Sequence, residues 1–349
     1  MGRVGRDKEL LALFLEAERS GTCLVATNDS LRKSLAVRKG RGEVVRPAKG
    51  MYARLSLWSK LSEKEKALHV LRTYQLLHPE WAFCRGSANL VYGLPVSFAD
   101  TKSVDVVVSP RQRYSATEGV RYHALPMDAR IESVNGLRVV SFERAVFDGL
   151  RFSDFPNGLA VADAAVRSGR MGKSELFSFF RNEGVRQKGR LKAEKTLLFA
   201  DGRSESPGES IARAIMIEMG FALPDLQVEF AHPLDSRRRY RVDFLWMRED
   251  GSRVIGEFDG RIKYEDVAMR RGRSAVRVLE DERIRESRLS VYGLPIMRFS
   301  YRDTVDRGRF ALLLGRFGVP HRERAAEEHE RLMRGRLACA STFSVVSFS

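Results

Sequence analysis

The strongest constraint on this chain is a set of acidic residues placed within apolar strands between residues 205 and 300. The pattern predicts a helix, three strands, a second helix and a last strand. Asp243 stands in the strand YRVDFLW, and Glu257 and Asp259 stand in the strand RVIGEFDG. Because successive side chains of a strand alternate between its faces, carboxylates two residues apart share one face. Asp243 can join them from the neighbouring strand, so these residues predict a cage for a divalent cation.

A fourth acid, Glu209, belongs to the helix SPGESIARAIMIEMGF that precedes the strands. Ser206 is a suitable N-cap, Pro207 suits the first helical position, and Glu209 follows the cap by three residues. That spacing is a capping box, which satisfies backbone N–H groups at the helix start. Glu209 therefore has two interpretations, a cap of its own helix or an outer contact of the acidic cage.

Length and charge limit the class of protein. A chain of 349 residues exceeds the usual size of one core, so we expect two or three domains. Lys and Arg number 61 against 45 Asp and Glu, a net charge of +16. Such a surplus favours a polyanionic partner, and nucleic acid is the first candidate. The alternative is a generally basic protein without such a partner.

Cysteine usage and hydropathy predict the compartment. The three cysteines, Cys23, Cys84 and Cys339, are far apart and show no C-x-x-C spacing, which favours reduced thiols over a disulfide frame or a zinc site. No apolar stretch approaches the roughly 20 residues that a membrane-spanning helix needs. We expect a cytoplasmic protein that has no membrane partner.

Residues 1–60 predict a small winged helix-turn-helix. A first helix has four apolar residues that predict one buried face: Leu10, Leu11, Phe14 and Leu15. Asn28 or Asp29 can cap a second helix, which runs to Gly40. The run EVVRPAKGMYAR then predicts two short strands around a turn, which is typical of a β-wing.

This first segment carries 13 basic and 6 acidic residues. A basic helix can enter the major groove of double-stranded DNA while cations of the wing contact phosphates. The alternative is a protein-interaction module whose charges are only solvated. The predicted DNA-binding residues are Arg32, Lys33, Arg38, Lys39, Arg46 and Lys49.

Residues 61–165 predict a second, mixed α/β domain. It begins with an amphipathic helix after Ser62, whose inward residues are expected to be Leu61, Leu68, Leu71 and Leu76. Asp105 and His123 are single polar residues near strands, and we assign them a structural role. Residues 166–204 predict a basic helical linker, residues 205–319 a third domain and residues 320–349 a mixed-charge tail.

The motifs KGMYAR, HPEWAFCRGSANLVYGLPV and GLRVVSFERAVFDGL resemble the AbiEi family of antitoxins over about residues 1–165. Members of that family join an N-terminal winged helix to an α/β domain. The resemblance implies a DNA-binding repressor of its own operon that acts as the antitoxin of a bacterial abortive-infection system. It also implies a toxin or operon partner.

The third domain resembles the PD-(D/E)XK nuclease superfamily, and within it the very-short-patch-repair endonucleases, through VDF followed by GEFDG. This resemblance implies that Asp243 and Glu257 hold Mg²⁺ and that Glu209 adds an outer contact. The superfamily normally has a lysine two residues after the second acid, where this chain has Asp259. Asp259 is then either a third metal ligand, with Lys263 supplying the catalytic cation, or part of a site that binds metal or DNA without cutting.

Together these features predict an α+β multidomain protein with a winged helix-turn-helix, a mixed α/β middle domain and a restriction-endonuclease-like α/β domain. Two functions remain. One is a DNA-binding, antitoxin-type transcriptional regulator. The other is an Mg²⁺-dependent DNA endonuclease that is directed to its target by the N-terminal domain.

Overall fold

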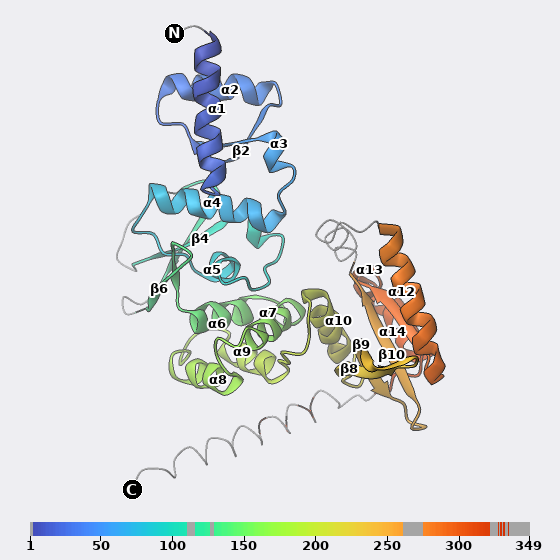
Figure 1. Ribbon diagram of the computed structural model, residues 1–349. Coiled ribbons are helices and arrows are strands. Elements are labelled where there is room, and N and C mark those ends of the chain that lie inside the picture. Colours follow the sequence, from blue (N-terminus) through green and yellow to red (C-terminus); the bar gives the residue numbers. More distant parts are fainter. Residues whose placement is uncertain are drawn as a thin grey trace. The chain divides into compact units, whose positions relative to one another are not determined.

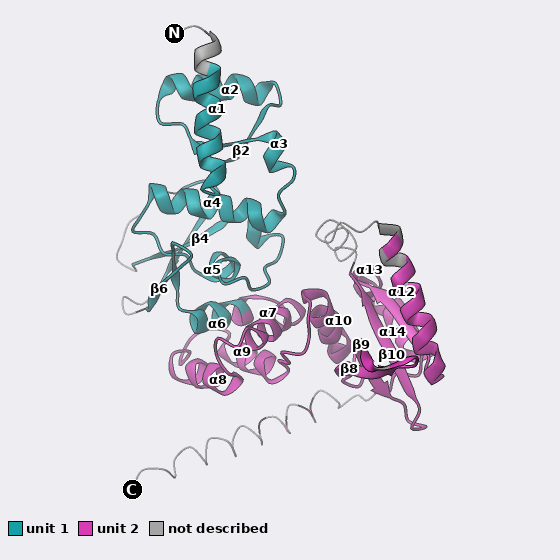
Figure 2. Ribbon diagram, in the orientation of Figure 1, with its two compact units in different colours: residues 1–149 teal, residues 150–349 magenta. Residues whose placement is uncertain are grey.

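The computed structural model describes residues 3–109, 116–125, 129–260 and 275–321, and also residues 327, 329, 331 and 334. The chain divides into two compact units, an N-terminal unit of residues 1–149 and a C-terminal unit of residues 150–349 (Figure 2). Figure 1 labels helices and strands of both. Both contain helices and strands, so the predicted mixture of α and β structure is confirmed. Within the described ranges, no helix is long and apolar enough to cross a membrane.

The first 60 residues form helices around a small antiparallel sheet of order β1-β3-β2. The second helix begins where the sequence predicts, because the Asn28 side chain accepts a hydrogen bond of 2.8 Å from the backbone N–H of Leu31. Gly50 closes the β2–β3 hairpin with a φ of +79°, which glycine adopts easily. The elements are α1 (Arg3–Arg19), β1 (Leu24–Val25), α2 (Asp29–Gly40), β2 (Val44–Ala48), β3 (Met51–Arg54) and α3 (Leu55–Trp58).

The core of this segment uses only half of the apolar face predicted for α1. Leu10 and Phe14 are buried against Leu35 of α2. Leu11 and Leu15 are 44% and 41% exposed, so their predicted burial is wrong. Each is one residue, or about 100°, further around the helix than the buried pair, and the small sheet does not reach that far.

The remainder of the N-terminal unit packs helices on two small sheets. β4 and β5 are parallel, β6 and β7 are antiparallel, and Phe83 bridges to a strand of each sheet. Ser62 caps α4 in a capping box with Glu65, but Leu76 is 70% exposed, so its predicted inward position is wrong. The elements are α4 (Glu63–Leu77), α5 (Arg85–Val91), η1 (Asp100–Lys102), β4 (Val104–Val108), β5 (Val120–Ala124), β6 (Ile131–Val134), β7 (Leu137–Val140) and α6 (Phe142–Phe152), whose end belongs to the C-terminal unit.

The C-terminal unit starts with a helical layer. It contains α7 (Phe155–Arg167), α8 (Lys173–Asn182) and α9 (Arg190–Leu198). The last two lie in the segment 166–204, which is helical as expected. Both have a buried apolar face, with Phe180 and Leu197 fully enclosed. These helices are therefore packed elements of the C-terminal unit.

A four-stranded sheet of order β11-β10-β9-β8 follows. β10 and β11 are parallel and the other pairs are antiparallel. The helix–strand order predicted for residues 205–300 is present, with α12 lying between β10 and β11 in the chain. The elements are α10 (Pro207–Glu218), β8 (Asp225–His232), β9 (Asp235–Met247), β10 (Arg253–Asp259), α12 (Ala275–Leu289), η2 (Ser290–Tyr292), β11 (Ile296–Ser300), α13 (Tyr301–Val305) and α14 (Arg307–Arg316).

Two apolar clusters hold this sheet. Phe244, Trp246 and Phe258 pack in one cluster with residues of α10 and α14. Leu245 and Ile255 pack in another with Leu289 of α12. Helices therefore contribute to both clusters, and the acidic residues of β9 and β10 stand between packed layers.

Candidate functional site

Helix α10 presents the buried side chain of Glu209 in its first turn. Glu209 is 1% exposed, and its Oε1 atom accepts a hydrogen bond of 2.7 Å from the Ser206 hydroxyl. Its Oε2 atom accepts one of 2.9 Å from the backbone N–H of Glu205. Ser206 caps α10, since its hydroxyl accepts a hydrogen bond of 3.2 Å from the backbone N–H of Glu209. The Glu209 carboxylate takes the N–H of the residue before the cap, and this bond does not prevent the carboxylate from facing the sheet.

A glycine allows α10 to approach the sheet closely. A Cβ atom on Gly208 would lie 2.3 Å from the Phe258 ring of β10, closer than packed atoms tolerate. The absence of a side chain at Gly208 therefore brings the neighbouring Glu209 to the edge of the acidic strands.

Gln227 of β8 links Glu209 to Asp243. Its Nε2 atom donates to Glu209 Oε2 at 3.1 Å and to Asp243 Oδ1 at 3.4 Å. Gln227 has a φ of +54°, a left-handed conformation that is uncommon for a residue with a side chain. Such strain persists where the surroundings fix the residue and is frequent at functional sites. The sequence analysis missed Gln227, since positive φ has no signature in the sequence LQVEF.

Asp243 and Glu257 are held by different partners. Asp243 Oδ2 accepts a hydrogen bond of 2.8 Å from the backbone N–H of Phe258, the residue after Glu257. Glu257 is 8% exposed, and its Oε1 atom lies 2.8 Å from Arg285 Nη2 of α12. Arg285 also donates to the backbone oxygen of Arg241. Glu257 is thus paired with a cation that comes from helix α12 and not from its own strand.

Asp259 is the predicted third ligand, and Lys263 is the predicted catalytic lysine. Asp259 is the last residue of β10 and is partly buried. Lys263 lies outside the described residues. Among the residues that the structure describes, no three His, Cys, Asp or Glu side chains converge closely enough to hold a metal ion. The described residues thus show no metal-binding group made of Asp243, Glu257 and Asp259, and this cage stays a prediction.

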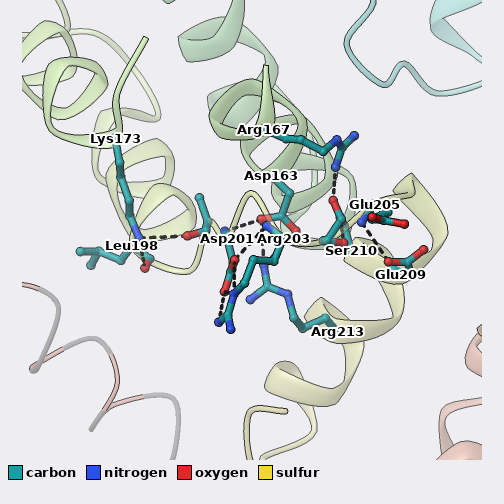
Figure 3. Close-up of polar contacts among 12 residues, drawn as sticks. Asp163, Arg167, Lys173, Leu198, Asp201, Arg203, Glu205, Glu209, Ser210 and Arg213 are labelled. Atoms are coloured by element: carbon teal, nitrogen blue, oxygen red, sulfur yellow. Dashed lines mark hydrogen bonds and ion pairs between the residues drawn. The ribbon is translucent and has the colours of Figure 1, made fainter. Parts of the chain in front are cut away.

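A buried charge network fixes α10 one turn after Glu209 (Figure 3). Arg213 of α10 lies 2.8 Å from both carboxylate oxygens of Asp163 of α7, and both side chains are buried. The backbone N–H of Asp201 donates to the same carboxylate at 2.8 Å. Burial raises the pKa of Asp163, although Arg213 and the Asp201 N–H act in the opposite direction. α10 therefore connects the helical layer, through Arg213, to the acidic strands, through Glu209.

The predicted DNA-binding cations differ in their availability. Lys33, Lys39, Arg46 and Lys49 are exposed, and no carboxylate of the described residues pairs with them. Arg32 pairs with Asp29 at 2.5 Å, but both side chains are exposed, so this pair is weak. Arg38 is 21% exposed and contacts both Asp7 and Glu43. Arg38 is thus partly used within the fold.

The structure joins two residues that the sequence analysis treated separately. His123 Nε2 lies 2.8 Å from Asp105 Oδ1, and Arg121 contacts both oxygens of Asp105. Burial alone would raise the pKa of Asp105, but hydrogen bonds from His123 and Arg121 outweigh it and lower the pKa. The parallel pairing of β4 and β5 brings these residues together. Asp105 is fully buried and paired with both residues, while the Arg121 side chain is 47% exposed. This pairing agrees with the structural role expected for Asp105 and His123.

No family model matches the chain. Two similar proteins, the uncharacterized proteins Rv2248 and MT2308 from two strains of Mycobacterium tuberculosis, are each 34% identical to it over 170 residues. Each match covers 47% of this chain and 58% of the relative. The chain therefore spans less than two thirds of the length of the relatives it matches.

Proposed function

We propose that this protein is a DNA-binding, antitoxin-type transcriptional regulator whose C-terminal unit contains a nuclease-like domain. The observation that carries the proposal is the set of exposed cations on α2 and on the β2–β3 hairpin that lack a carboxylate partner in the described part of the chain: Lys33, Lys39, Arg46 and Lys49. Cations that are free of intramolecular partners are available to phosphates. Leu35 is fully buried, so α2 has one face in the core and can present its basic residues outward.

The proposal also includes the partners of the regulator and its location in the cell. Double-stranded DNA is the main partner, and the resemblance to AbiEi antitoxins adds a toxin or operon partner. A regulator of this kind would work in the cytoplasm. The winged helix-turn-helix assignment is supported by the order of α1, α2 and the β2–β3 hairpin.

A duplex-binding measurement tests the regulator proposal. The full chain and an Arg32→Ala, Lys33→Ala double variant are titrated into a labelled 30-bp duplex of mixed sequence at several salt concentrations. Each lost phosphate contact lowers the slope of log K against log salt by about 1, so we expect the slope to fall by about 2 and the affinity to fall. Lys8→Ala, an exposed charge on α1, is the matched control and should leave the slope unchanged. Equal slopes for all three proteins would remove α2 from the DNA interface.

A second function, Mg²⁺-dependent DNA cleavage, is favoured by the link between Glu209, Gln227 and Asp243 and by the position of Glu257 beside Phe258. Asp243 and Glu257 would hold the ion, since Mg²⁺ often uses only one or two protein carboxylates together with water. When bound, such an ion stabilises developing charge on a phosphodiester and lowers the pKa of a bound water. Arg285 would supply the positive charge that Asp259 does not.

Plasmid cleavage in Mg²⁺ tests this second function. We expect nicking by the full chain and a loss of at least about 100-fold in Asp243→Asn and in Glu257→Gln, since each removes a ligand charge. Glu229→Gln is the matched control, because Glu229 is an exposed carboxylate on the same sheet. Cutting that all three variants retain equally, or that does not depend on metal, would eliminate the nuclease function and leave the regulator proposal intact.

A further inference from the structure

The N-terminal unit contains a cleft of about 610 Å³ that extends beyond the predicted DNA-binding residues. The cleft is lined by Lys39 of α2 and by Arg46 and Lys49 of the β2–β3 hairpin. Lys66 of α4 and Lys102 of η1 also line it. Five cations from four elements therefore surround one space. Lys66 and Lys102 belong to the middle domain and were not among the predicted binding residues.

Three acidic residues, Glu63, Asp100 and Glu118, also line the cleft, so its five cations leave a formal surplus of two positive charges. Glu63 is paired with Lys66 at 2.7 Å, and Asp100 interacts with Ser97 and Arg121. Within the described ranges, no carboxylate pairs with the four other cations. Like charges that face one space repel each other, and a bound anion would remove that repulsion. The charge of the cleft thus favours an anion that carries more than one negative charge.

An aromatic side chain adds a second kind of contact. Trp58 lines the cleft and is partly exposed, and its ring packs edge-on against His69 with centroids 6.1 Å apart. The indole is therefore held in position while part of it faces the cleft. An aromatic ring beside several cations suits a base attached to phosphates, because bases stack on such rings. Inorganic anions would use only the cations.

Hydrogen bonds join α4, which lines the cleft, to the segment that precedes α2. The backbone N–H of Cys23 donates to the Thr73 hydroxyl of α4 at 2.8 Å, and that hydroxyl donates to the backbone oxygen of His69 at 2.7 Å. Arg72 also donates to the backbone oxygen of Gly21. These bonds tie the segment that carries the hairpin to α4, so the cations are placed before a ligand arrives. Such preorganisation lowers the entropic cost of binding.

We propose that this cleft binds linked phosphate groups, with Trp58 available to an unpaired base attached to them. Two sources share the linked phosphates: a free nucleoside triphosphate, which also supplies the base, and the backbone of a bound nucleic acid. The triphosphate source does not depend on the regulator function. The nucleic-acid source rests on the proposed DNA binding and extends its surface from the wing to α4 and η1.

Titration of the full chain with ATP tests the site, with adenosine as the ligand that lacks phosphates. We expect ATP to bind and adenosine not to bind, and the Kd for ATP to rise at least tenfold in a Lys39→Ala, Lys102→Ala double variant. Trp58→Ala should weaken ATP binding but should leave binding of inorganic triphosphate unchanged. Lys64→Ala is the matched control, because Lys64 is exposed on α4 and does not line the cleft.

A second arm distinguishes the two sources. If the 30-bp duplex displaces ATP, the phosphates of both occupy the cleft. If ATP binds without displacement, the free nucleotide is the ligand. If ATP does not bind but Lys102→Ala weakens the duplex more than Lys64→Ala does, nucleic acid is the ligand. Failure of ATP to bind, together with equal duplex affinities for Lys102→Ala and Lys64→Ala, overturns the proposal. The Arg32→Ala, Lys33→Ala variant separates this outcome from failure of the regulator function, since its substitutions lie outside the cleft.

Discussion

Lys173 shows how a single buried cation depends on its surroundings. Its Nζ atom donates to the backbone oxygens of Leu198 and Ala200 at 2.8 and 3.1 Å, at the end of α9. Burial is the main cause that lowers the pKa of Lys173 to about 8, and the positive charge of Arg213 lowers it further. Lys173 therefore adds an ionisable group near neutral pH to the helical layer behind α10.

This pKa predicts a pH-dependent stability. The pKa of Lys173 lies below its ordinary value of 10.5, so between pH 8 and 10.5 the unfolded chain binds more protons at this residue than the folded chain. The free energy of unfolding should then rise with pH in that interval, by up to about 1.4 kcal/mol per pH unit from this residue. Denaturant unfolding of the protein and of Lys173→Arg, which stays charged, isolates the effect. Lys188→Arg, at an exposed position, should behave like the unsubstituted protein. Parallel pH curves for all three would contradict the assigned pKa.

Among the elements, those set by local signals could be predicted from the sequence. The capped starts of α2, α4 and α10 follow from Asn28, Ser62 and Ser206, whose side chains act within three residues. The β2–β3 hairpin follows from its Lys–Gly turn, and β8 to β10 follow from their apolar strands. Such signals are local, so they hold before any tertiary packing is known.

Contacts between elements could not be predicted in the same way. Gln227 reaches Glu209 across 18 positions, and Glu257 meets Arg285 across 28. Those contacts depend on how α10 and α12 pack on the sheet, and the pattern of apolar and polar residues in the sequence does not specify that packing. Arg285 lies among several arginines of α12, and nothing in its sequence position distinguishes it from Arg283. The carboxylates of the candidate site were therefore identified from the sequence, whereas Gln227 was missed and Arg285 was not singled out as the partner of Glu257.

The exposed leucines show a second limit of prediction from sequence, which concerns how much of one helix face is buried. A 3.6-residue period predicts which side of a helix is apolar, but the partner determines how much of that side is covered. Leu76 stands near the end of α4 and is 70% exposed, whereas Leu71 is buried in the same helix. Helical periodicity alone therefore overestimates the core where a helix extends past its neighbours.

At the scale of the whole molecule, the two compact units have separate apolar cores. Leu35 is fully buried in a cluster of the N-terminal unit with Leu10 and Phe14. Leu314 is fully buried in a cluster of the C-terminal unit with Phe244 and Trp246. A compact unit with its own core can unfold as its own cooperative step, and chains with more than one such unit depart from two-state behaviour.

Matched substitutions in the two cores test whether the units unfold separately. We expect two thermal transitions, with Leu35→Ala lowering one and Leu314→Ala lowering the other. Each substitution removes a fully buried leucine and should cost about 2–5 kcal/mol, because it loses burial and leaves a cavity. Calorimetry resolves the transitions, and fluorescence assists because Trp58 and Trp81 lie in the N-terminal unit and Trp246 in the C-terminal unit. Leu312→Ala, at a position that is 71% exposed, should shift neither transition appreciably. A single transition that both core variants lower equally would show that the units unfold together.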